Sequence, residues 1–163
     1  MANRFHPSVS IGKFSSIEIS SRGTDTVIGE NCVIDDFVKI KHVGGTGNIE
    51  IGNFVFINSG TVLYSGNGIK IGSHVLIGPN CNLTPVNHQF SDPDKLIRLQ
   101  GFQPTRGGIV IEDDVWLGAG VSVLDGAVIR KGCIVGANSL VKEELVENGI
   151  YVGNPLKFIK LRK

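Results

Sequence analysis

The sequence predicts an all-β protein, and three observations indicate this class. Glycine is abundant, with 22 residues among 163, while proline numbers only 6, a combination that indicates many tight turns in an ordered chain. Isoleucine and valine together number 37 against 11 leucines, and β-branched side chains favour strands over helices. An aliphatic residue also recurs with a period of six, which fits neither a helix nor a long alternating strand.

The period of six is clearest from Ile111, where the chain reads IEDDVW, LGAGVS, VLDGAV, IRKGCI, VGANSL and VKEELV. Each hexapeptide begins with an aliphatic residue, and both this position and the fifth are expected to face inward. A short strand followed by a turn satisfies the pattern, because three strands close a coil of about eighteen residues and coils stack through parallel hydrogen bonds. We therefore expect a parallel β-helix of about six coils.

Insertions are predicted wherever the spacing of the hexapeptides departs from eighteen. Successive starts at Ile28, Ile51, Ile71 and Ile111 are 23, 20 and 40 residues apart. The last interval has room for one regular coil and then a loop over residues 89–108. A loop of this length in a regular scaffold is usually functional.

Composition sets limits on location and partners. The net charge is +1, from 16 basic and 15 acidic side chains, so no nucleic acid or anionic membrane partner is expected. No apolar run approaches the roughly 18 residues that span a bilayer, and the opening MANRFHPSVS lacks the apolar core of a signal peptide. We expect a cytoplasmic protein with one domain over residues 1–163, including a C-terminal tail over 147–163.

The three cysteines predict structural packing. Cys32, Cys81 and Cys133 form no CxxC pair, and their odd number suits a reducing compartment. Each occupies the fifth position of a hexapeptide, which faces inward and takes small residues.

These repeats resemble the hexapeptide-repeat acyltransferase superfamily over nearly the whole chain, and the resemblance implies a left-handed coil. Two segments, VNHQFSDPDKLIRLQGFQPTRGGIVIEDDVWLGAGVSVL and YVGNPLKFIK, are similar to its sugar O-acetyltransferase branch. That branch includes maltose and galactoside acetyltransferases and, as the closer likeness, enzymes that acetylate capsule or lipopolysaccharide sugars. The resemblance implies acetyl-CoA as co-substrate, no metal, and a homotrimer with clefts between adjacent subunits.

His88 is the histidine that matches the catalytic motif of this branch. A sugar hydroxyl attacks a thioester poorly unless a base accepts its proton, and imidazole can accept the proton and return it to the leaving thiolate. The neighbouring Asn87, or a backbone carbonyl, would hold the ring tautomer. The alternative is a polar loop residue at a coil corner. His6, His42 and His74 are expected to be solvated at the surface.

A zinc site is the metal alternative, because γ-class carbonic anhydrases share this fold and bind zinc through three histidines, two of them five residues apart. Here the nearest pair, His74 and His88, is fourteen residues apart. We therefore expect no metal site.

The motif VWLGAG carries the expected site for the acyl donor. By the resemblance, Gly118 and Ala119 lie beside the thioester and the Ala119 N–H donates to the oxyanion, an interaction worth about 2.7 to 4 kcal/mol of barrier. One coil later, Gly136 and Ala137 match the position that contacts the pantetheine amides. Trp116 is expected either to wall the cleft for both substrates or to fill a subunit contact.

Cations are expected near the phosphates of the donor. The family commonly reads Val-Thr-Lys after the last repeat, and here Lys142 stands one residue earlier. Lys157 and Lys160 match basic positions of the family's C-terminal segment, and the alternative for both is a solvated basic tail.

The acceptor would be a sugar or oligosaccharide. Asn58 aligns with an asparagine that lines the acceptor pocket of related sugar acetyltransferases, and an amide suits sugar hydroxyls. Residues 65–67 (Ser-Gly-Asn) replace the paired aspartates of the family. The sequence thus predicts an O-acetyltransferase of surface polysaccharide biosynthesis with His88 as general base. An N-acetyltransferase of an amino sugar and a non-catalytic β-helix scaffold are the alternatives.

Overall fold

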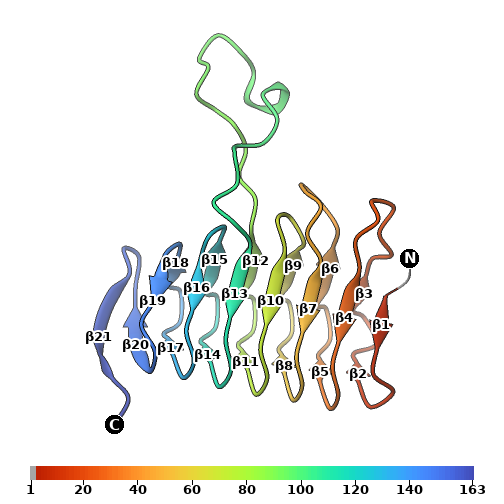
Figure 1. The fold of residues 1–163 in the computed structure, drawn as a ribbon, viewed down its shortest axis with the longest axis vertical. Coiled ribbons are helices and arrows are strands. Elements are labelled where there is room, and N and C mark those ends of the chain that lie inside the picture. Colours follow the sequence, from red (N-terminus) through yellow and green to blue (C-terminus); the bar gives the residue numbers. More distant parts are fainter. Residues whose placement is uncertain (1–2) are drawn as a thin grey trace.

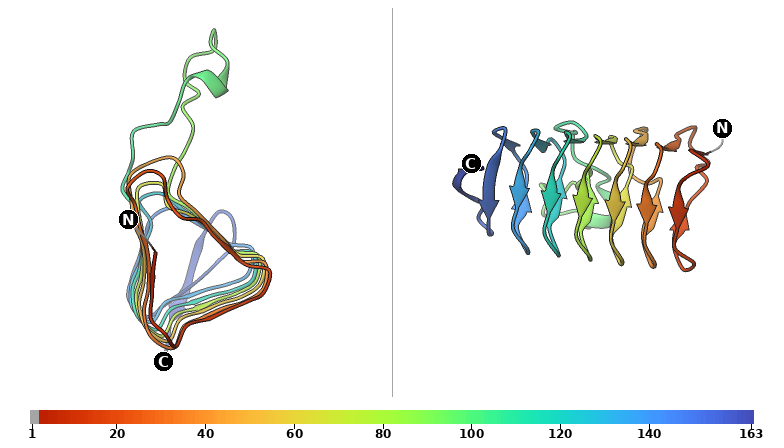
Figure 2. Two further views of the ribbon diagram at one scale, coloured as in Figure 1. Left: turned by 90° about the vertical axis from the view of Figure 1, so that its right-hand side faces the viewer. Right: turned by 90° about the horizontal axis from the view of Figure 1, so that it is seen from below.

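The computed structural model describes residues 3–163 and confirms the all-β class. Three sheets of short strands form the three faces of a triangular prism (Figures 1 and 2). The described residues contain a single helical turn, the 3₁₀ helix η1 (Ile97–Leu99). No helix within residues 3–163 has both the length and the apolar character needed to cross a membrane.

Each face of the prism is one sheet, here named sheet A, sheet B and sheet C. Sheet A consists of β1 (Arg4–Phe5), β4 (Thr26–Ile28), β7 (Ile49–Ile51), β10 (Ile69–Ile71), β13 (Ile109–Ile111), β16 (Val128–Ile129) and β19 (Glu144–Leu145). Sheet B consists of β2 (Ser10–Ile11), β5 (Val33–Ile34), β8 (Phe56–Ile57), β11 (Leu76–Ile77), β14 (Trp116–Leu117), β17 (Ile134–Val135), β20 (Gly149–Val152) and β21 (Lys157–Leu161). Sheet C consists of β3 (Ser16–Ile17), β6 (Lys39–Lys41), β9 (Val62–Tyr64), β12 (Asn82–Thr84), β15 (Ser122–Leu124) and β18 (Leu140–Val141).

The strands follow the chain from sheet A to sheet B to sheet C and back. Neighbours within each sheet are parallel, apart from β20 and β21, which are antiparallel. Because sheet C has six strands, six coils are complete, and β19 and β20 begin a seventh. The prediction of a left-handed parallel β-helix of about six coils is confirmed.

The interior of the prism is the core, and the hexapeptide pattern fills it as expected. The first and fifth positions of the six hexapeptides from Ile111 onward are all buried. In-register stacking continues the columns, as where Ile69 pairs with Ile49 on one side and with Ile109 on the other. Each buried aliphatic side chain contributes about 1.5–3 kcal/mol relative to an exposed one.

Glycine and asparagine occupy many of the corners, and Phe37, Phe54, His74 and Asp114 occupy others with the same left-handed backbone. At the corner between sheets B and C, here called the B/C corner, Asn80 and Asn138 have φ of 57° and 56°, and Gly60 and Gly120 have φ of 73° and 68°. This left-handed conformation is costly for most side chains and cheap for glycine and asparagine. The abundance of these residues in the sequence follows from the number of corners.

The long loop leaves the prism at the corner between sheets C and A, here called the C/A corner. It separates β12 from β13, projects well beyond the coils and includes η1 (Figures 1 and 2). The long loop predicted after His88 is confirmed, and the whole segment between the two strands spans residues 85–108.

The C-terminal segment folds back on the last coil. Strand β21 pairs with β20 in the antiparallel direction, with Val152 opposite Lys157. Beyond it, the Arg162 guanidinium donates to the Gly132 carbonyl at 3.0 Å and to the Asp114 carboxylate at 2.9 Å. The C-terminal edge of sheet B is thereby covered by a strand of opposite direction.

Candidate active site

His88 lies in the first of two stems that carry the loop. The first stem (87–89) and the second stem (101–106) run antiparallel, with an isolated bridge between His88 and Phe102. Backbone N–H groups donate across the stems, from Gln89 to Gly101 at 2.9 Å and from Gln103 to Asn87 at 2.8 Å. This pairing holds the exposed His88 side chain at the base of the projecting loop.

The His88 ring packs against Phe102 in a tilted arrangement. Its centroid lies 5.0 Å from that of Phe102, with an angle of 33° between the ring planes. Within the described residues, no hydrogen bond involves the His88 ring. Its polar edge is therefore free to meet a substrate.

Asn87 does not orient the His88 ring through its side chain. Its amide instead donates to the Asp125 carboxylate, and its carbonyl accepts from the Gln103 N–H. The structure thus places Asn87 beside His88, as the motif implies, and assigns its side chain to a different partner.

Asp125 is a residue of this site that the sequence analysis missed. It follows β15 at the C/A corner and is only 3% exposed. The Arg106 guanidinium donates to both of its carboxylate oxygens, at 2.9 and 3.2 Å, and the Arg106 backbone N–H donates at 3.3 Å. Hydrogen bonding from Arg106 holds the pKa of the Asp125 carboxyl below its usual value.

A strand register that can be read from the sequence would have located Asp125. The hexapeptides align Leu83 with Val123, and the structure confirms this pair. Two residues further along each chain segment, Asp125 occupies the position equivalent to Pro85, two residues before Asn87. An acidic residue at this position of the adjacent coil was the signal that could have located Asp125.

The residues expected at the acyl donor lie on the B/C corner. Ala119 and Ala137 occupy equivalent turns in adjacent coils, and within residues 3–163 neither N–H donates a hydrogen bond. The neighbouring Gly118 leaves no space for a side chain, since a Cβ there would lie 2.6 Å from the Ala137 nitrogen. Backbone donors at this corner are thus accessible and regularly spaced.

Trp116 and Asn58 flank these donors. Trp116 lies on the outer face of sheet B, paired with Leu76 and Ile134, and is 52% exposed. Asn58 is on the same corner as Ala119, two coils away, or about 10 Å at the usual spacing of strands. Its amide donates to the Ile77 carbonyl at 2.9 Å, which leaves its side-chain oxygen available to a ligand.

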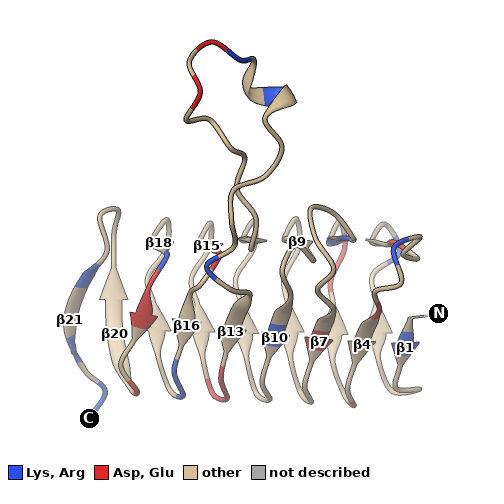
Figure 3. Ribbon diagram, turned by 45° about the horizontal axis from the view of Figure 1, so that its top comes forward, with Lys and Arg blue, Asp and Glu red and all other residues tan. Residues whose placement is uncertain are grey.

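The predicted cations are exposed and lie in two places. Lys157 and Lys160 are on β21 at the C-terminal end of sheet B, where Figure 3 shows basic residues along the strand. Lys142 follows β18 at the C/A corner.

Within one chain, the structure does not bring the base and the oxyanion donor together. His88 lies at the C/A corner, whereas Trp116, Gly118, Ala119, Gly136 and Ala137 lie on sheet B or the B/C corner. These two corners are the opposite edges of sheet C.

The expectation for His42 is wrong. His6 and His74 are exposed as expected, but His42 is buried between Thr24 and Thr26, with ring nitrogens 2.8 and 3.0 Å from their hydroxyl oxygens. Strand β6 continues its in-and-out alternation for one residue beyond Lys41, and this turns His42 inward. Burial lowers the pKa of His42.

The cysteines face the core as expected. All three are buried, and their thiols donate to the carbonyls of Gly52, Gly118 and Val146 at 3.0–3.2 Å. Burial raises the pKa of each thiol. No group of three potential metal-ligating side chains occurs among residues 3–163.

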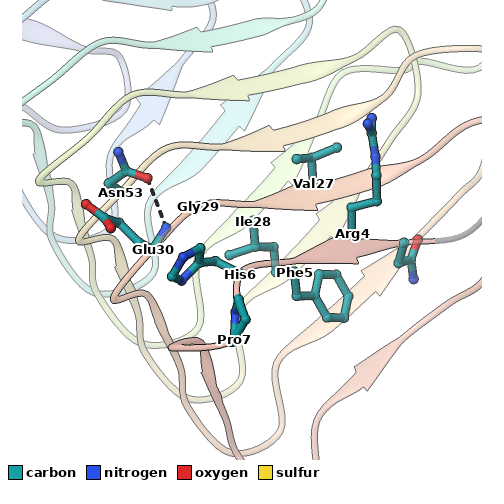
Figure 4. A pocket seen from close by; sticks show the side chains of 10 residues that line it. Arg4, Phe5, His6, Pro7, Val27, Ile28, Gly29, Glu30 and Asn53 are labelled. Atoms are coloured by element: carbon teal, nitrogen blue, oxygen red, sulfur yellow. Dashed lines mark hydrogen bonds between the residues drawn. The ribbon is translucent and has the colours of Figure 1, made fainter.

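A pocket elsewhere on the molecule contains none of the predicted site residues. It lies at the N-terminal coil, where Arg4, His6, Glu30 and Asn53 are part of its lining (Figure 4). Asn53 accepts a hydrogen bond from the Glu30 N–H and so belongs to the scaffold.

Comparisons with known proteins agree with the β-helical fold. Residues 108–143 match the family model described as bacterial transferase hexapeptide (six repeats). Over 128 residues the chain is 38% identical to a galactoside O-acetyltransferase of Lactococcus lactis subsp. lactis, covering 78% of this chain and 59% of that protein. The chain thus spans less than two thirds of that relative.

Two further relatives are covered more fully. A protein of Escherichia coli named as a colanic acid biosynthesis acetyltransferase, WcaF, is 31% identical over 135 residues, which are 83% of this chain and 69% of that protein. The crystal structure of a mutant of AntD, an N-acyltransferase from Bacillus cereus, in complex with dTDP and coenzyme A superposes with a TM-score of 0.81 at 30% identity. That match covers 99% of this chain and 84% of AntD.

Proposed function

Because the chain belongs to the bacterial transferase hexapeptide family, we propose that it is an acetyl-CoA-dependent O-acetyltransferase acting on a sugar hydroxyl. The observation that carries the proposal is the exposed His88 imidazole. It lies at the base of a loop whose two stems pair with each other, and its ring nitrogens have no hydrogen-bond partner among the described residues. The name of the Lactococcus relative supports an oxygen acceptor, and that of WcaF supports a sugar of surface polysaccharide.

His88 acts as the general base. It accepts the proton of the acceptor hydroxyl while the hydroxyl oxygen bonds to the carbonyl carbon of the thioester, which acetyl-CoA supplies when bound. When the C–S bond breaks, His88 returns the proton to the thiolate sulfur. The products are an acetyl ester and a free thiol, and the transfer needs no covalent enzyme intermediate. Positioned proton transfer of this kind contributes about 10² to 10⁴ in rate.

The Ala119 N–H donates a hydrogen bond to the oxyanion that forms on the thioester oxygen. It is a backbone group on a rigid coil with no partner among the described residues, so it is oriented before the reaction begins. Its free N–H and the absence of side chains at Gly118 and Gly136 fit a pantetheine arm laid along this corner, with Ala137 donating one coil further. Trp116 lines one side of this groove. The positive charges of Lys142, Lys157 and Lys160 attract the phosphates of acetyl-CoA.

A complete site requires a second copy of the chain. His88 and Ala119 lie at opposite edges of sheet C, so the C/A corner of one copy must face the B/C corner of its neighbour. A ring of three copies satisfies this requirement for every subunit, since each contributes one corner of each kind. We therefore propose a homotrimer.

The acceptor lies between Asn58 and His88. The free Asn58 side-chain oxygen can accept a hydrogen bond from a sugar hydroxyl. Trp116 offers an apolar face to the sugar ring.

N-acetylation of an amino sugar is the second candidate. AntD, which matches 99% of this chain, is an N-acyltransferase, and a free base beside a thioester serves an amine as well as a hydroxyl. Hydroxyl and amino acceptors therefore have to be tested together.

The test is release of free thiol from acetyl-CoA with a panel of hydroxyl and amino sugars. His88→Ala is expected to lower kcat by about 10² to 10⁴, while His74→Ala, which removes an exposed histidine outside the site, serves as the matched control. Equal rates in wild type and His88→Ala would remove the catalytic proposal in favour of a scaffold. Transfer to amino sugars alone would overturn O-acetylation.

A further inference from the structure

The two stems of the long loop meet at one buried carboxylate. Asp125 accepts from the Asn87 amide of the first stem and from the Arg106 guanidinium and backbone N–H of the second. The Asp125 side chain is 5% exposed, whereas that of Arg106 is 52% exposed. The loop is thus anchored from inside the corner by the acid.

This anchor is separate from the backbone pairing of the stems. Asp125 belongs to the turn after β15, one coil beyond the strand from which the loop departs. Through Asp125 the stems are joined to the rigid core of the next coil, and a buried carboxylate with several donors strongly favours one arrangement of those donors.

The His88 ring depends on this arrangement for its place. Within the described residues, no hydrogen bond or ion pair holds the ring, which is placed by the stem backbone and packs against Phe102. Asn87 is its immediate neighbour in the chain, and Phe102 lies on the stem that leads to Arg106. A change in the separation of the stems would therefore move the ring relative to any bound substrate.

We propose that Asp125 is a positioning residue for the catalytic histidine: by joining Asn87 to Arg106 it sets the position of the His88 imidazole. The inference rests on the proposed role of His88 as general base. Asp125 would contact neither substrate, and its effect on the reaction would pass through His88.

Kinetics supply the first test. Asp125→Asn keeps the shape of the side chain and can still accept from Asn87, but it loses the ion pair with Arg106. We expect kcat to fall about 10- to 100-fold, because small displacements of a reacting group are costly. The KM for acetyl-CoA should stay within twofold, since the B/C corner is untouched.

Two further variants separate positioning from folding. Arg106→Gln removes the half-exposed partner and should give the same loss of kcat, and the double variant should be no slower than either single one. Arg130→Gln is the matched control, because it breaks two surface ion pairs, with Glu112 and with Glu144, away from the loop and should leave kcat unchanged.

A spectroscopic test reads the ring itself and does not depend on activity. The chain has four histidines, so ¹³C-labelled histidine gives four Cε1–H resonances that single substitutions assign. In Asp125→Asn the His88 resonance should move toward its value in Phe102→Ala, where the contact between the two rings is lost. The His74 resonance should not move, because that ring stacks on Phe54, with centroids 5.0 Å apart, at the corner between sheets A and B.

The outcomes distinguish the two proposals. A His88 resonance that stays unchanged in Asp125→Asn and Arg106→Gln overturns the positioning role, as does an unchanged kcat. A wild-type protein that transfers acetyl to no acceptor overturns the proposed function, and the spectra then still decide whether Asp125 positions the ring.

Discussion

Adding one methyl group at Gly118 should separate two coils of the helix. An ideal Cβ at Gly118 would lie 2.6 Å from the Ala137 nitrogen and 3.0 Å from both the Ala137 Cα and the Gly136 carbonyl carbon. All three are backbone atoms of the next coil, and the Gly118 N–H also donates to the Val135 carbonyl at 2.7 Å. No side-chain rotation can relieve the contact.

Gly136, one coil further along the same corner, is the matched control. A Cβ there would first meet Val152 Cγ1 at 2.8 Å and then the Tyr151 carbonyl oxygen at 3.5 Å. Val152 is 39% exposed, so its side chain can turn away toward solvent. The same substitution thus meets backbone at Gly118 and a movable methyl group at Gly136.

We expect Gly118→Ala to lower the free energy of unfolding by about 2 kcal/mol, within the range for overpacking, and to lower Tm by roughly 4–8 °C for a chain of this size. Gly136→Ala should stay within about 0.5–1 kcal/mol, because the restricted unfolded chain offsets part of the cost. Urea unfolding at one fixed protein concentration measures both, since assembly also contributes to stability. Equal losses in the two variants would refute this steric reasoning.

Three further predictions concern titration and charge. Because burial lowers the pKa of His42, its contribution to the free energy of unfolding should be complete above about pH 6.5 and be lost as the pH falls toward the folded-state pKa. Urea unfolding at a series of pH values should show a smaller pH dependence in His42→Gln. An unchanged pH dependence would contradict the prediction. Because burial raises the pKa of all three thiols, a chromogenic disulfide at about pH 8 should titrate none in the folded protein and all three after denaturation; a fast-reacting native thiol would be the contrary result. Replacing both Lys157 and Lys160 by alanine should raise the KM for acetyl-CoA severalfold at low salt and leave kcat unchanged, whereas an unaltered KM would show the basic tail to be simply solvated.

The hexapeptide pattern was sufficient to predict the coil. Aliphatic residues such as Ile111 and Leu117 mark the inward positions, and the breaks in their spacing locate the loop after His88. Such a periodic pattern is local information, because each inward residue stacks on its counterpart in the next coil. The left-handed sense of the coil came from the family resemblance and could not be derived from spacing.

The sequence did not lead us to expect that the residue just after a sheet C strand faces the core. In four coils these strands are three residues long, and the residue that follows is buried: His42, Ser65, Pro85 and Asp125. Each of these residues is the third of its hexapeptide, a position that the pattern assigns to a turn. The alternation of inward and outward side chains nevertheless continues through it. The same omission explains both the wrong expectation for His42 and the missed role of Asp125.

The family resemblance already implied clefts between adjacent subunits, with His88 opposite a backbone donor of the neighbouring copy. The fold supplies the geometric reason, because His88 and Ala119 occupy opposite edges of sheet C. The motifs identify the chemical roles of the two residues, whereas the distance between the C/A and B/C corners is set by the triangular cross-section of the coil.

The reversed strand β21 has a consequence for solubility. A stack of parallel coils ends in unpaired backbone groups that could template further strands, and such edges promote fibre growth. At the C-terminal end β21 pairs with β20 in the opposite sense, carries Lys157 and Lys160 on its exposed surface, and is followed by the Arg162 ion pair with Asp114. On sheet B a second molecule therefore meets a reversed, basic strand in place of a matching parallel edge, which disfavours end-to-end pairing through this face.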